Sequence, residues 1–243
     1  MIYQMKLIKF DKLDSTNTYA KQNLDMLEDK SVISADFQTA GYGRFTRSWV
    51  DLGTENIYMT FVLKPSEIFL QMHANLTQYL SVCLCKLLED MGLSPAIKWP
   101  NDVLLNDKKV CGILAEATFR GAKLKGIALG IGVNLNSSPQ SLGLIDRPAT
   151  SLNLELGRDI DKDEFLQKLV DKFFSEYDEL LDKGFVHMQD YYESHASFLH
   201  QNIKVAVFDK TKEGVFCGFD SDGTLLLRTP DGQIEKINMG ELV

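Results

Sequence analysis

The chain has 243 residues, a formal net charge of −8, 44% hydrophobic residues and 25% charged residues. This composition is ordinary for a globular protein with a sizeable core, and the acidic balance argues against a general nucleic-acid binder. No stretch of 18 or more apolar residues predicts a membrane span, and the N-terminus lacks the apolar segment of a signal peptide. We therefore expect a cytoplasmic protein with one large domain, or with a main domain and a small one.

The first third of the chain predicts strands and one helix around a long loop. A strand at 5–10 is followed by Ser15, Thr16 and Asn17, which are residue types that cap a helix N-terminus, here a helix of about ten residues. Two further strands are predicted from runs of residues with high β-propensity, at 31–38 and 56–63.

A long helix is predicted next, over 71–91. Its apolar residues recur at spacings of three and four, as expected for an amphipathic helix with a core-facing stripe: Leu76, Leu80, Cys83, Leu84, Leu87 and Leu88. The strand at 96–99 leads to a hairpin whose tight turn is Asn106-Asp107. A glycine-rich strand follows at 125–135, and a second long helix is predicted over 161–181, ending before Gly184.

The pattern changes after about Gln201. Short strands at 203–208, 212–219, 224–228 and 233–238 are separated by the turns "DSDG" and "TPDG". We expect a main domain over 1–198 and a small β-barrel over 199–243, which should pack on the rest because a domain this small is marginal alone. Strands and helices do not alternate strictly, so the fold class is α+β.

The four cysteines do not form a recognisable metal-binding pattern. Nothing has the spacing of zinc ligands, and a reducing compartment would keep these side chains as free thiols: Cys83, Cys85, Cys111 and Cys217.

The stretch "GYGRFTRSW" at 41–49 is cationic and aromatic, which is unusual in an acidic chain. Glycine allows a close backbone approach to a ligand, and arginine offers planar donors that match carboxylate and phosphate. The stretch matches neither the phosphate-binding P-loop nor the dinucleotide fingerprint. Taken alone, the stretch is better explained as a solvated turn with surface arginines, because charged loop residues are usually solvated.

Three other short stretches combine polar residues with strand ends. They are "KWPND" at 98–102, "KKVCGILAE" at 108–116 and "GIGVNLN" at 130–136. Polar groups at strand ends commonly position ligands, and a lysine at the mouth of a buried strand is a candidate electrostatic catalyst. The alternatives are a proline turn, a surface lysine and a β-bulge, respectively.

Together, in this order, these stretches resemble the biotin–protein ligases, in the short form without an N-terminal DNA-binding domain. "LDSTN" (13–17), "QTAGYGRFTRSW" (38–49) and "ENIYMT" (55–60) match in the first part of the chain, and "KWPND", "KVCGIL" and "GIGVNLN" match further on. The resemblance covers nearly the whole chain. It departs from the family loop G-R-G-R-x-G-R-x-W at Tyr42 and Thr46, where arginine and glycine are usual.

The resemblance implies a mixed-sheet catalytic domain like that of the class II aminoacyl-tRNA synthetases, followed by a small SH3-like β-barrel. It also implies roles for individual residues. Lys109, Arg44 and Asp102 would be catalytic. Biotin would be bound by Ser15, Thr16, Asn17, Gln38, Gly43, Arg44, Lys109 and Gly112. ATP would be bound by Arg44, Arg47, Trp49, Asn101, Lys109 and Asn134, and Asp102 could orient Lys109, bind metal or help deprotonate the acceptor lysine.

The implied reaction forms biotinyl-5'-AMP from biotin and ATP with Mg²⁺, then transfers biotin to a lysine of a biotin carboxyl carrier protein domain. The loop would be mobile when empty and would close over the adenylate. No DNA or membrane partner is expected, no metal-ligating side chains are assigned, and the chain would be a monomer or a homodimer. The alternatives are a lipoate or octanoate–protein ligase, and a biotin-binding paralogue without catalysis.

Overall fold

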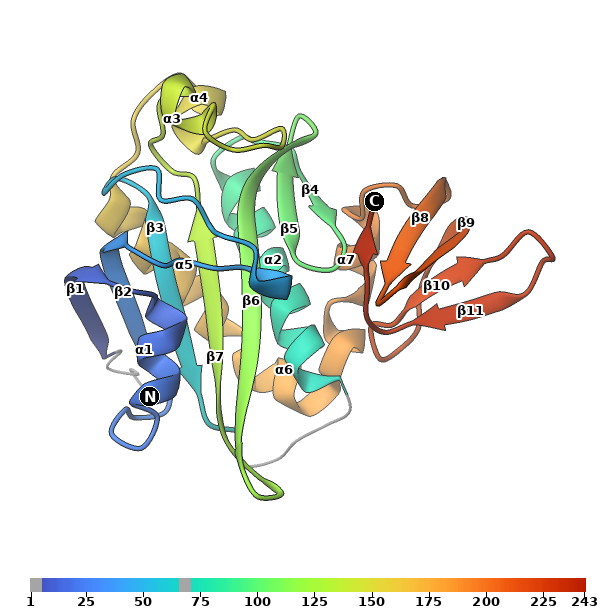
Figure 1. Cartoon of the computed structure of the whole chain (residues 1–243), viewed down its shortest axis with the longest axis horizontal. Coiled ribbons are helices and arrows are strands. Elements are labelled where there is room, and N and C mark those ends of the chain that lie inside the picture. The colour runs from blue at the N-terminus through green and yellow to red at the C-terminus, as the bar shows by residue number, and fades with distance from the viewer. Residues whose placement is uncertain (1–5, 66–70) are drawn as a thin grey trace. The chain divides into compact units, whose positions relative to one another are not determined.

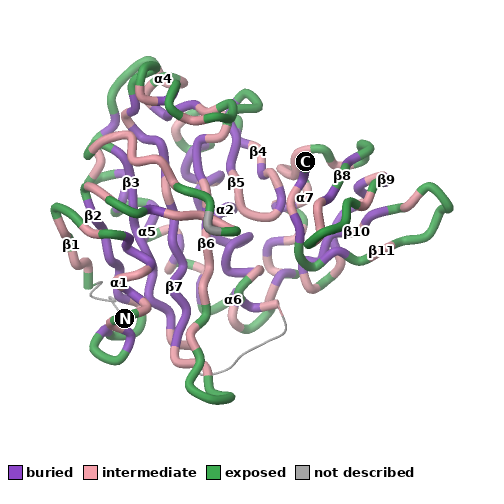
Figure 2. Tube along the Cα trace, viewed as in Figure 1, coloured by how far each residue is buried: buried purple, intermediate pink, exposed green. Residues whose placement is uncertain are grey.

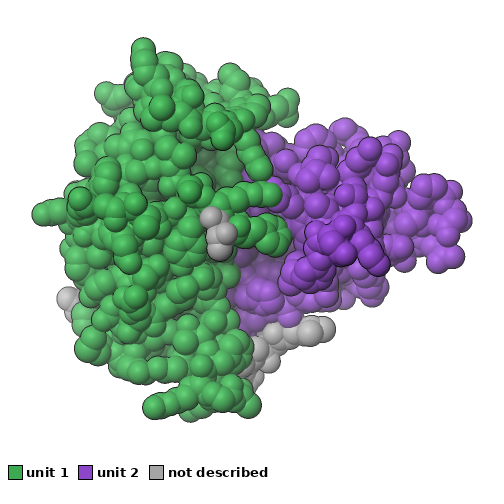
Figure 3. Space-filling model, viewed as in Figure 1, with its two compact units in different colours: residues 1–68, 105–168 green, residues 69–104, 169–243 purple. Residues whose placement is uncertain are grey.

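The computed structural model describes residues 6–65 and 71–243, with Thr46 described through its backbone alone. The chain forms two compact units, each built from two separated stretches (Figure 3). The first unit comprises 1–68 and 105–168, and the second comprises 69–104 and 169–243. The sequence-based domain boundary between 198 and 199 divides the chain differently and stays a prediction.

The first unit is built on a mixed sheet (Figure 1). Its strands lie in the order β1 (Leu7–Leu13), β2 (Ser31–Gln38), β3 (Ile57–Leu63), β7 (Lys123–Val133) and β6 (Lys108–Arg120). The β1–β2 pair is parallel and the other three pairs are antiparallel. The α+β class is confirmed. The strand predicted at 5–10 runs to Leu13, and residue 5 lies outside the described residues.

Helix α1 (Thr16–Gln22) packs across β2, β3 and β7. Ser15 is its N-cap, as predicted, and its side chain accepts a hydrogen bond from the backbone of Thr18. The helix has seven residues rather than about ten. Residues of α1, the turn after it and the sheet bury one apolar cluster: Ala20, Leu24, Leu27, Ile33, Val62 and Ala128. Figure 2 shows β3 and β7 buried along most of their length, which fixes the sheet under α1.

Short connections complete the first unit. Asn106 and Asp107 both have positive φ, 49° and 60°, as a two-residue hairpin turn requires, so the predicted turn is confirmed. Helices α3 (Pro139–Leu142) and α4 (Leu152–Leu156) were not predicted, because four or five residues are too few to show a helical period.

The second unit is built around α2 (Met72–Asp90). The predicted apolar stripe is confirmed as buried, but polar residues on other faces of the helix, such as Asn75, Gln78 and Ser81, are buried too. This unit also holds β4 (Pro95–Lys98), β5 (Asp102–Leu105, whose last residue belongs to the first unit), α6 (Tyr177–Lys183), η2 (Gly184–His187) and α7 (Gln189–Ser194).

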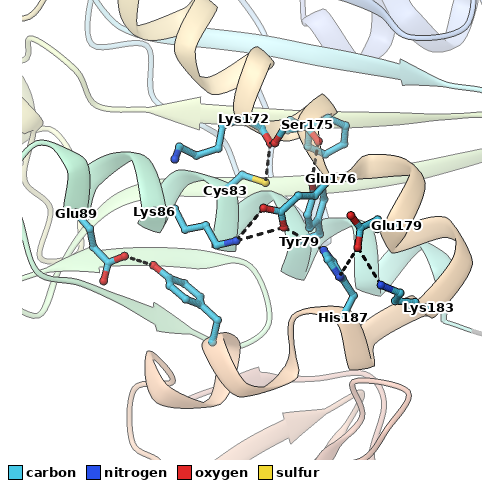
Figure 4. A network of polar contacts seen from close by, with 12 residues as sticks. Tyr79, Cys83, Lys86, Glu89, Lys172, Ser175, Glu176, Glu179, Lys183 and His187 are labelled. Carbon is cyan, nitrogen blue, oxygen red and sulfur yellow. Dashed lines mark hydrogen bonds and ion pairs between the residues drawn. The ribbon is translucent and has the colours of Figure 1, made fainter. Parts of the chain in front are cut away.

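The single helix predicted over 161–181 is wrong at one position. The chain forms α5 (Lys162–Ser175) and then α6, with a break at Glu176, which has a non-helical φ of −122°. Figure 4 shows the polar contacts at this break. The Glu176 carboxylate lies 3.3 Å from Lys86 Nζ of α2 and 3.0 Å from His187 Nε2 of η2. At the break, Glu176 thus bonds to side chains from α2 and η2, while the local helical period of the sequence continues through it.

The C-terminal part of the second unit is a five-stranded antiparallel sheet; four of its strands were predicted, as parts of a small β-barrel. The strand order is β11 (Ile234–Ile237), β10 (Leu225–Arg228), β9 (Lys210–Phe219), β8 (Asn202–Val207) and β12 (Glu241–Leu242). The last strand has two residues and was not predicted.

Buried amides of α2 hold one turn of this sheet. Asn75 Nδ2 donates to the carbonyl of Asp222 at 2.9 Å, and Gln78 Nε2 donates to the carbonyl of Gly223 at 2.9 Å. Gly223 has a φ of 84°, and a Cβ there would lie 2.6 Å from Gln78 Oε1. The small sheet therefore packs on a helix from the middle of the chain, as expected for a domain that is marginal alone.

The cysteine prediction is confirmed. All four are free thiols, and three of them, Cys83, Cys85 and Cys111, are buried. Burial raises the pKa of the Cys83 thiol to about 12. Within the described residues, no helix combines the length and the apolar character needed to cross a membrane.

Gly223→Ala should destabilise the protein more than Gly232→Ala. Both glycines have positive φ, but a Cβ at Gly232 meets nothing within 4 Å. The control should lose about 1–2 kcal/mol from backbone strain alone, and Gly223→Ala about 2 kcal/mol more from the clash with Asn75 and Gln78. Urea unfolding measures both losses, and equal losses would show that the α2 amides do not constrain this turn.

Candidate functional site

A polar cradle lies at the start of α1, inside the first unit. Gln38 Oε1 accepts hydrogen bonds from the backbone of Thr16 at 2.8 Å and from its hydroxyl at 3.2 Å. Thr60 Oγ1 lies 2.8 Å from Thr16 Oγ1 and 2.6 Å from Asn17 Oδ1. With its oxygen fixed in this way, Gln38 presents its amide nitrogen beside Gly41, where a Cβ would lie only 2.8 Å away. Three of the eight predicted biotin-binding residues, Thr16, Asn17 and Gln38, are therefore neighbours. A fourth, Ser15, caps the same helix.

The side-chain amide nitrogen of Asn17 makes two hydrogen bonds within the protein. Its Nδ2 donates to the carbonyl of Leu114 at 3.3 Å and to Glu116 Oε2 at 3.0 Å. A Cβ at Gly130 would lie 2.2 Å from Asn17 Oδ1, so this site requires glycine on β7. What Asn17 can offer a ligand is acceptor capacity on Oδ1.

The glycines of "GIGVNLN" do not mark a β-bulge. The β6–β7 register runs without a shift from Cys111–Val133 to Thr118–Gly126. A Cβ at Gly132 would lie 2.6 Å from the indole ring of Trp49, and one at Gly112, directly opposite on β6, would lie 2.7 Å from the same ring. Residues two apart on a strand share a face, so Asn17 over Gly130 and Trp49 over Gly132 lie on one face of the sheet.

Lys109 lies at the same place. Its Nζ is 5.3 Å from the centroid of the Trp49 ring, and a Cβ at Gly112 would lie 3.1 Å from it. The backbone of Lys109 donates to the carbonyl of Pro148 and accepts from the N–H of Thr150, both at 2.9 Å. Lys109 and Gly112, predicted from one motif, and Trp49, predicted from another, are brought together.

Asn134 holds the backbone segment that pairs with Lys109. It is buried, and its Nδ2 donates to the carbonyl of Thr150 at 3.0 Å, which fixes the segment that pairs with Lys109. The amide nitrogen is therefore bound to the protein, and the predicted contact with ATP stays a prediction.

The stretch 41–49 forms a closed hairpin, although no strand period runs through its sequence. Tyr42 and Ser48 form an antiparallel bridge, Trp49 N–H donates to the carbonyl of Gly41 at 2.9 Å, and Gly43 N–H donates to the carbonyl of Arg47 at 2.7 Å. Gly43, predicted to offer its backbone to biotin, thus uses its N–H inside the loop.

The tip of the hairpin carries an exposed aromatic ring between two arginines. Phe45 is 57% exposed and has a φ of 55°. The guanidinium groups of Arg44 and Arg47 lie 5.0 and 5.8 Å from the centroid of its ring. The hairpin therefore presents two cations together, which suits a polyanionic ligand.

Glu116 was not predicted as a site residue. Its carboxylate accepts from Lys21 Nζ at 2.6 Å, from the Tyr42 hydroxyl at 2.7 Å and from Asn17. Burial alone would raise the pKa of Glu116, but these three hydrogen bonds outweigh it and lower the pKa. Burial, and then the contact with Glu116, raise the pKa of Tyr42. The sequence signal was the alternation of "GILAE", which puts Glu116 on the face of Gly112 and Leu114.

Asn101 and Asp102 follow the cis Trp99–Pro100 bond and belong to the second unit. Their predicted roles at this site stay predictions. Within 6–65 and 71–243, no group of three histidine, cysteine, aspartate or glutamate side chains is arranged to hold a metal ion.

Two family models match the chain. Residues 9–134 match the biotin/lipoate A/B protein ligase family, and residues 198–243 match the biotin protein ligase C-terminal domain. The biotin–[acetyl-CoA-carboxylase] ligase of Paracoccus denitrificans is 35% identical over 231 residues, covering 91% of this chain and 94% of the relative. The bifunctional ligase/repressor BirA of Bacillus subtilis is 32% identical, covering 97% of this chain and 73% of the relative.

Solved structures agree. The biotin protein ligase from Aquifex aeolicus in complex with biotin and ATP superposes with a TM-score of 0.83 at 29% identity, covering 98% of this chain and 97% of that one. With these matches, and with the mixed sheet and the C-terminal antiparallel sheet, the chain belongs to the biotin protein ligase family and is a ligase.

Proposed function

We propose that this chain activates biotin as biotinyl-5'-AMP and then transfers biotin to a lysine of a biotin carboxyl carrier protein domain. The observation that carries this proposal is the single sheet face on which the polar cradle of Thr16 and Gln38, the cation Lys109 and the ring of Trp49 adjoin. The Aquifex aeolicus relative, which binds biotin and ATP, supports both substrates. The name of the Paracoccus denitrificans relative supports a carboxylase as the acceptor.

The first step joins two anions. A biotin carboxylate oxygen attacks the α-phosphorus of ATP, a new C–O–P linkage forms, and pyrophosphate leaves. Two unit charges about 4 Å apart repel by roughly 4 kcal/mol at an effective dielectric constant near 20. Lys109, held by backbone hydrogen bonds on both sides, offers a preorganised cation that offsets this repulsion and stabilises the transition state.

The cradle would bind the biotin end of the adenylate, and the hairpin would bind its nucleotide end. The ureido ring of biotin is polar on both sides, and the Gln38 amide nitrogen and the Thr16 hydroxyl supply matching groups. Trp49 offers an aromatic face for adenine, while Arg44 and Arg47 offer cations for the phosphates. Mg²⁺, when bound with ATP, would neutralise phosphate charge; the chain contributes Arg44, Arg47 and Lys109 beside it.

In the second step, the acceptor lysine amine attacks the acyl carbon of biotinyl-5'-AMP and AMP leaves. The mixed anhydride also reacts with water, so the hairpin has to cover it until the carrier arrives. We propose that the hairpin exchanges between a closed and an open position without ligand, and that bound adenylate holds it closed.

Biotin-dependent ATP–pyrophosphate exchange tests the substrate and the first step together. We expect exchange with biotin and none with lipoate, because an apolar lipoyl chain leaves the polar groups of the cradle unpaired. Exchange with lipoate instead would assign the chain to lipoate ligation. If neither biotin nor lipoate supports exchange, although the protein is folded and binds biotin, the chain is a paralogue without adenylation activity.

Lys109→Ala should lower the rate of adenylate formation at least about a hundredfold, as removal of a preorganised charge-stabilising group does in other enzymes. The matched control is Lys108→Ala, since Lys108 is the neighbouring, exposed lysine on the same strand. Single-turnover kinetics at saturating biotin and ATP measure both variants. Equal rates in Lys109→Ala and wild type would refute the bridging role of Lys109.

A further inference from the structure

Three donors from two segments converge on the carboxylate of Glu116. Lys21 Nζ and Asn17 Nδ2 come from α1, and the Tyr42 hydroxyl comes from the cationic hairpin. The Glu116 side chain is 25% exposed and that of Lys21 32% exposed. Lys21 Nζ also lies 5.6 Å from the centroid of the Tyr42 ring. The acceptor is therefore charged and partly shielded, which makes hydrogen bonds to it stronger than those between neutral groups.

The hairpin is closed by its own backbone bonds, so its position depends on what its base touches. Two aromatic side chains, one from each arm of the hairpin, reach the sheet. Trp49 lies against Gly112 and Gly132, and Tyr42 reaches Glu116. Gly112 and Glu116 lie on the same strand, four residues apart, and therefore on the same face. The hairpin is thus held at two points along β6, and Arg44 follows Tyr42 by two residues.

We propose that Glu116 is a positioning residue, which holds the cationic hairpin over the site through the hydroxyl of Tyr42. This inference rests on the proposed function, because what the hairpin retains is the adenylate. Glu116 touches neither reacting atom. Through Asn17 it also fixes one residue of the cradle, so a single carboxylate sets the relative position of the hairpin and the cradle within the first unit.

Lys21 makes this arrangement favourable. A carboxylate with no cation nearby would be costly at this depth, and Lys21 supplies the opposite charge from α1 while Tyr42 supplies an uncharged donor. The tyrosine hydroxyl thus takes a hydrogen-bonding role at position 42 without adding a second cation to Glu116. Removing the hydroxyl leaves the Lys21–Glu116 ion pair in place, which makes Tyr42→Phe a narrow test.

The experiment compares Tyr42→Phe, Glu116→Ala and the double variant with wild type in two assays. The first follows trypsin cleavage after Arg44 and Arg47 in the ligand-free chain, which needs no catalytic activity. The second follows release of biotinyl-5'-AMP from the enzyme after the first step. We expect Tyr42→Phe to raise both rates by about tenfold, the scale of one hydrogen bond to a charged group, and Glu116→Ala to raise them at least as much, because it also removes the contacts with Lys21 and Asn17. The double variant should match Glu116→Ala, because the Tyr42 hydroxyl has no further effect once its acceptor is gone.

The control is Tyr19→Phe, a change of the same kind on α1, where the ring packs on Phe10. It should leave both rates unchanged. Wild-type cleavage and release rates in Tyr42→Phe would overturn the proposal, as would multiplied effects in the double variant. If wild type forms no adenylate, the proposed function fails, and the trypsin assay alone decides whether Glu116 holds the hairpin. The melting temperature of each variant is measured as well. A variant that has lost stability in general would melt at a lower temperature and would be recognised in this way.

Discussion

The site depends on three glycines that lie on one face of β6 and β7. Gly130 leaves room for the amide of Asn17, while Gly112 and Gly132 leave room for the ring of Trp49. Any Cβ at these places would come within 2.7 Å of those groups, closer than non-bonded atoms approach, so the cradle and the hairpin base could not both lie on the sheet. The glycines cost the strands some intrinsic stability, and the continuous register and the buried neighbours of β7 compensate for it.

Charge is distributed to match this geometry. The protein as a whole is acidic, yet Lys109, Arg44 and Arg47 come from β6 and the hairpin that adjoins it. Cations gathered in an acidic chain suit a small polyanion better than an extended nucleic-acid backbone. Glu116 does not oppose this arrangement, because Lys21 pairs with it at 2.6 Å.

Much of the fold was predictable from local patterns. The strand at 31–38, the cap at Ser15 and the turn at Asn106–Asp107 follow from β-propensity, capping chemistry and positive φ. The break at Glu176 was not predictable, because the helical period of the side chains continues through it. The hairpin at 41–49 was missed because backbone bonds, rather than a period of side chains, close it.

For the site, motifs identified residue types, but not their neighbours. The resemblance pointed to Gly112 and Trp49 from different motifs, and the β6–β7 pairing, which sets Gly112 opposite Gly132, explains why the Trp49 ring fits there. The alternation of the strand puts Glu116 on the face of Gly112, but it does not show that Lys21 and Tyr42 bind there; Thr60 was missed because a lone threonine in a strand has no distinctive spacing. The role of Gly130 could only emerge once the position of Asn17 was known.

The most direct measurement of the central claim is a rapid chemical quench of the chain with biotin and α-labelled ATP, followed by a chase with a biotin carboxyl carrier domain. The account predicts that about one equivalent of biotinyl-5'-AMP accumulates on the enzyme, then disappears as the carrier lysine becomes biotinylated and labelled AMP appears. Biotinylated carrier without any bound adenylate, or adenylate that the carrier never consumes, would contradict it.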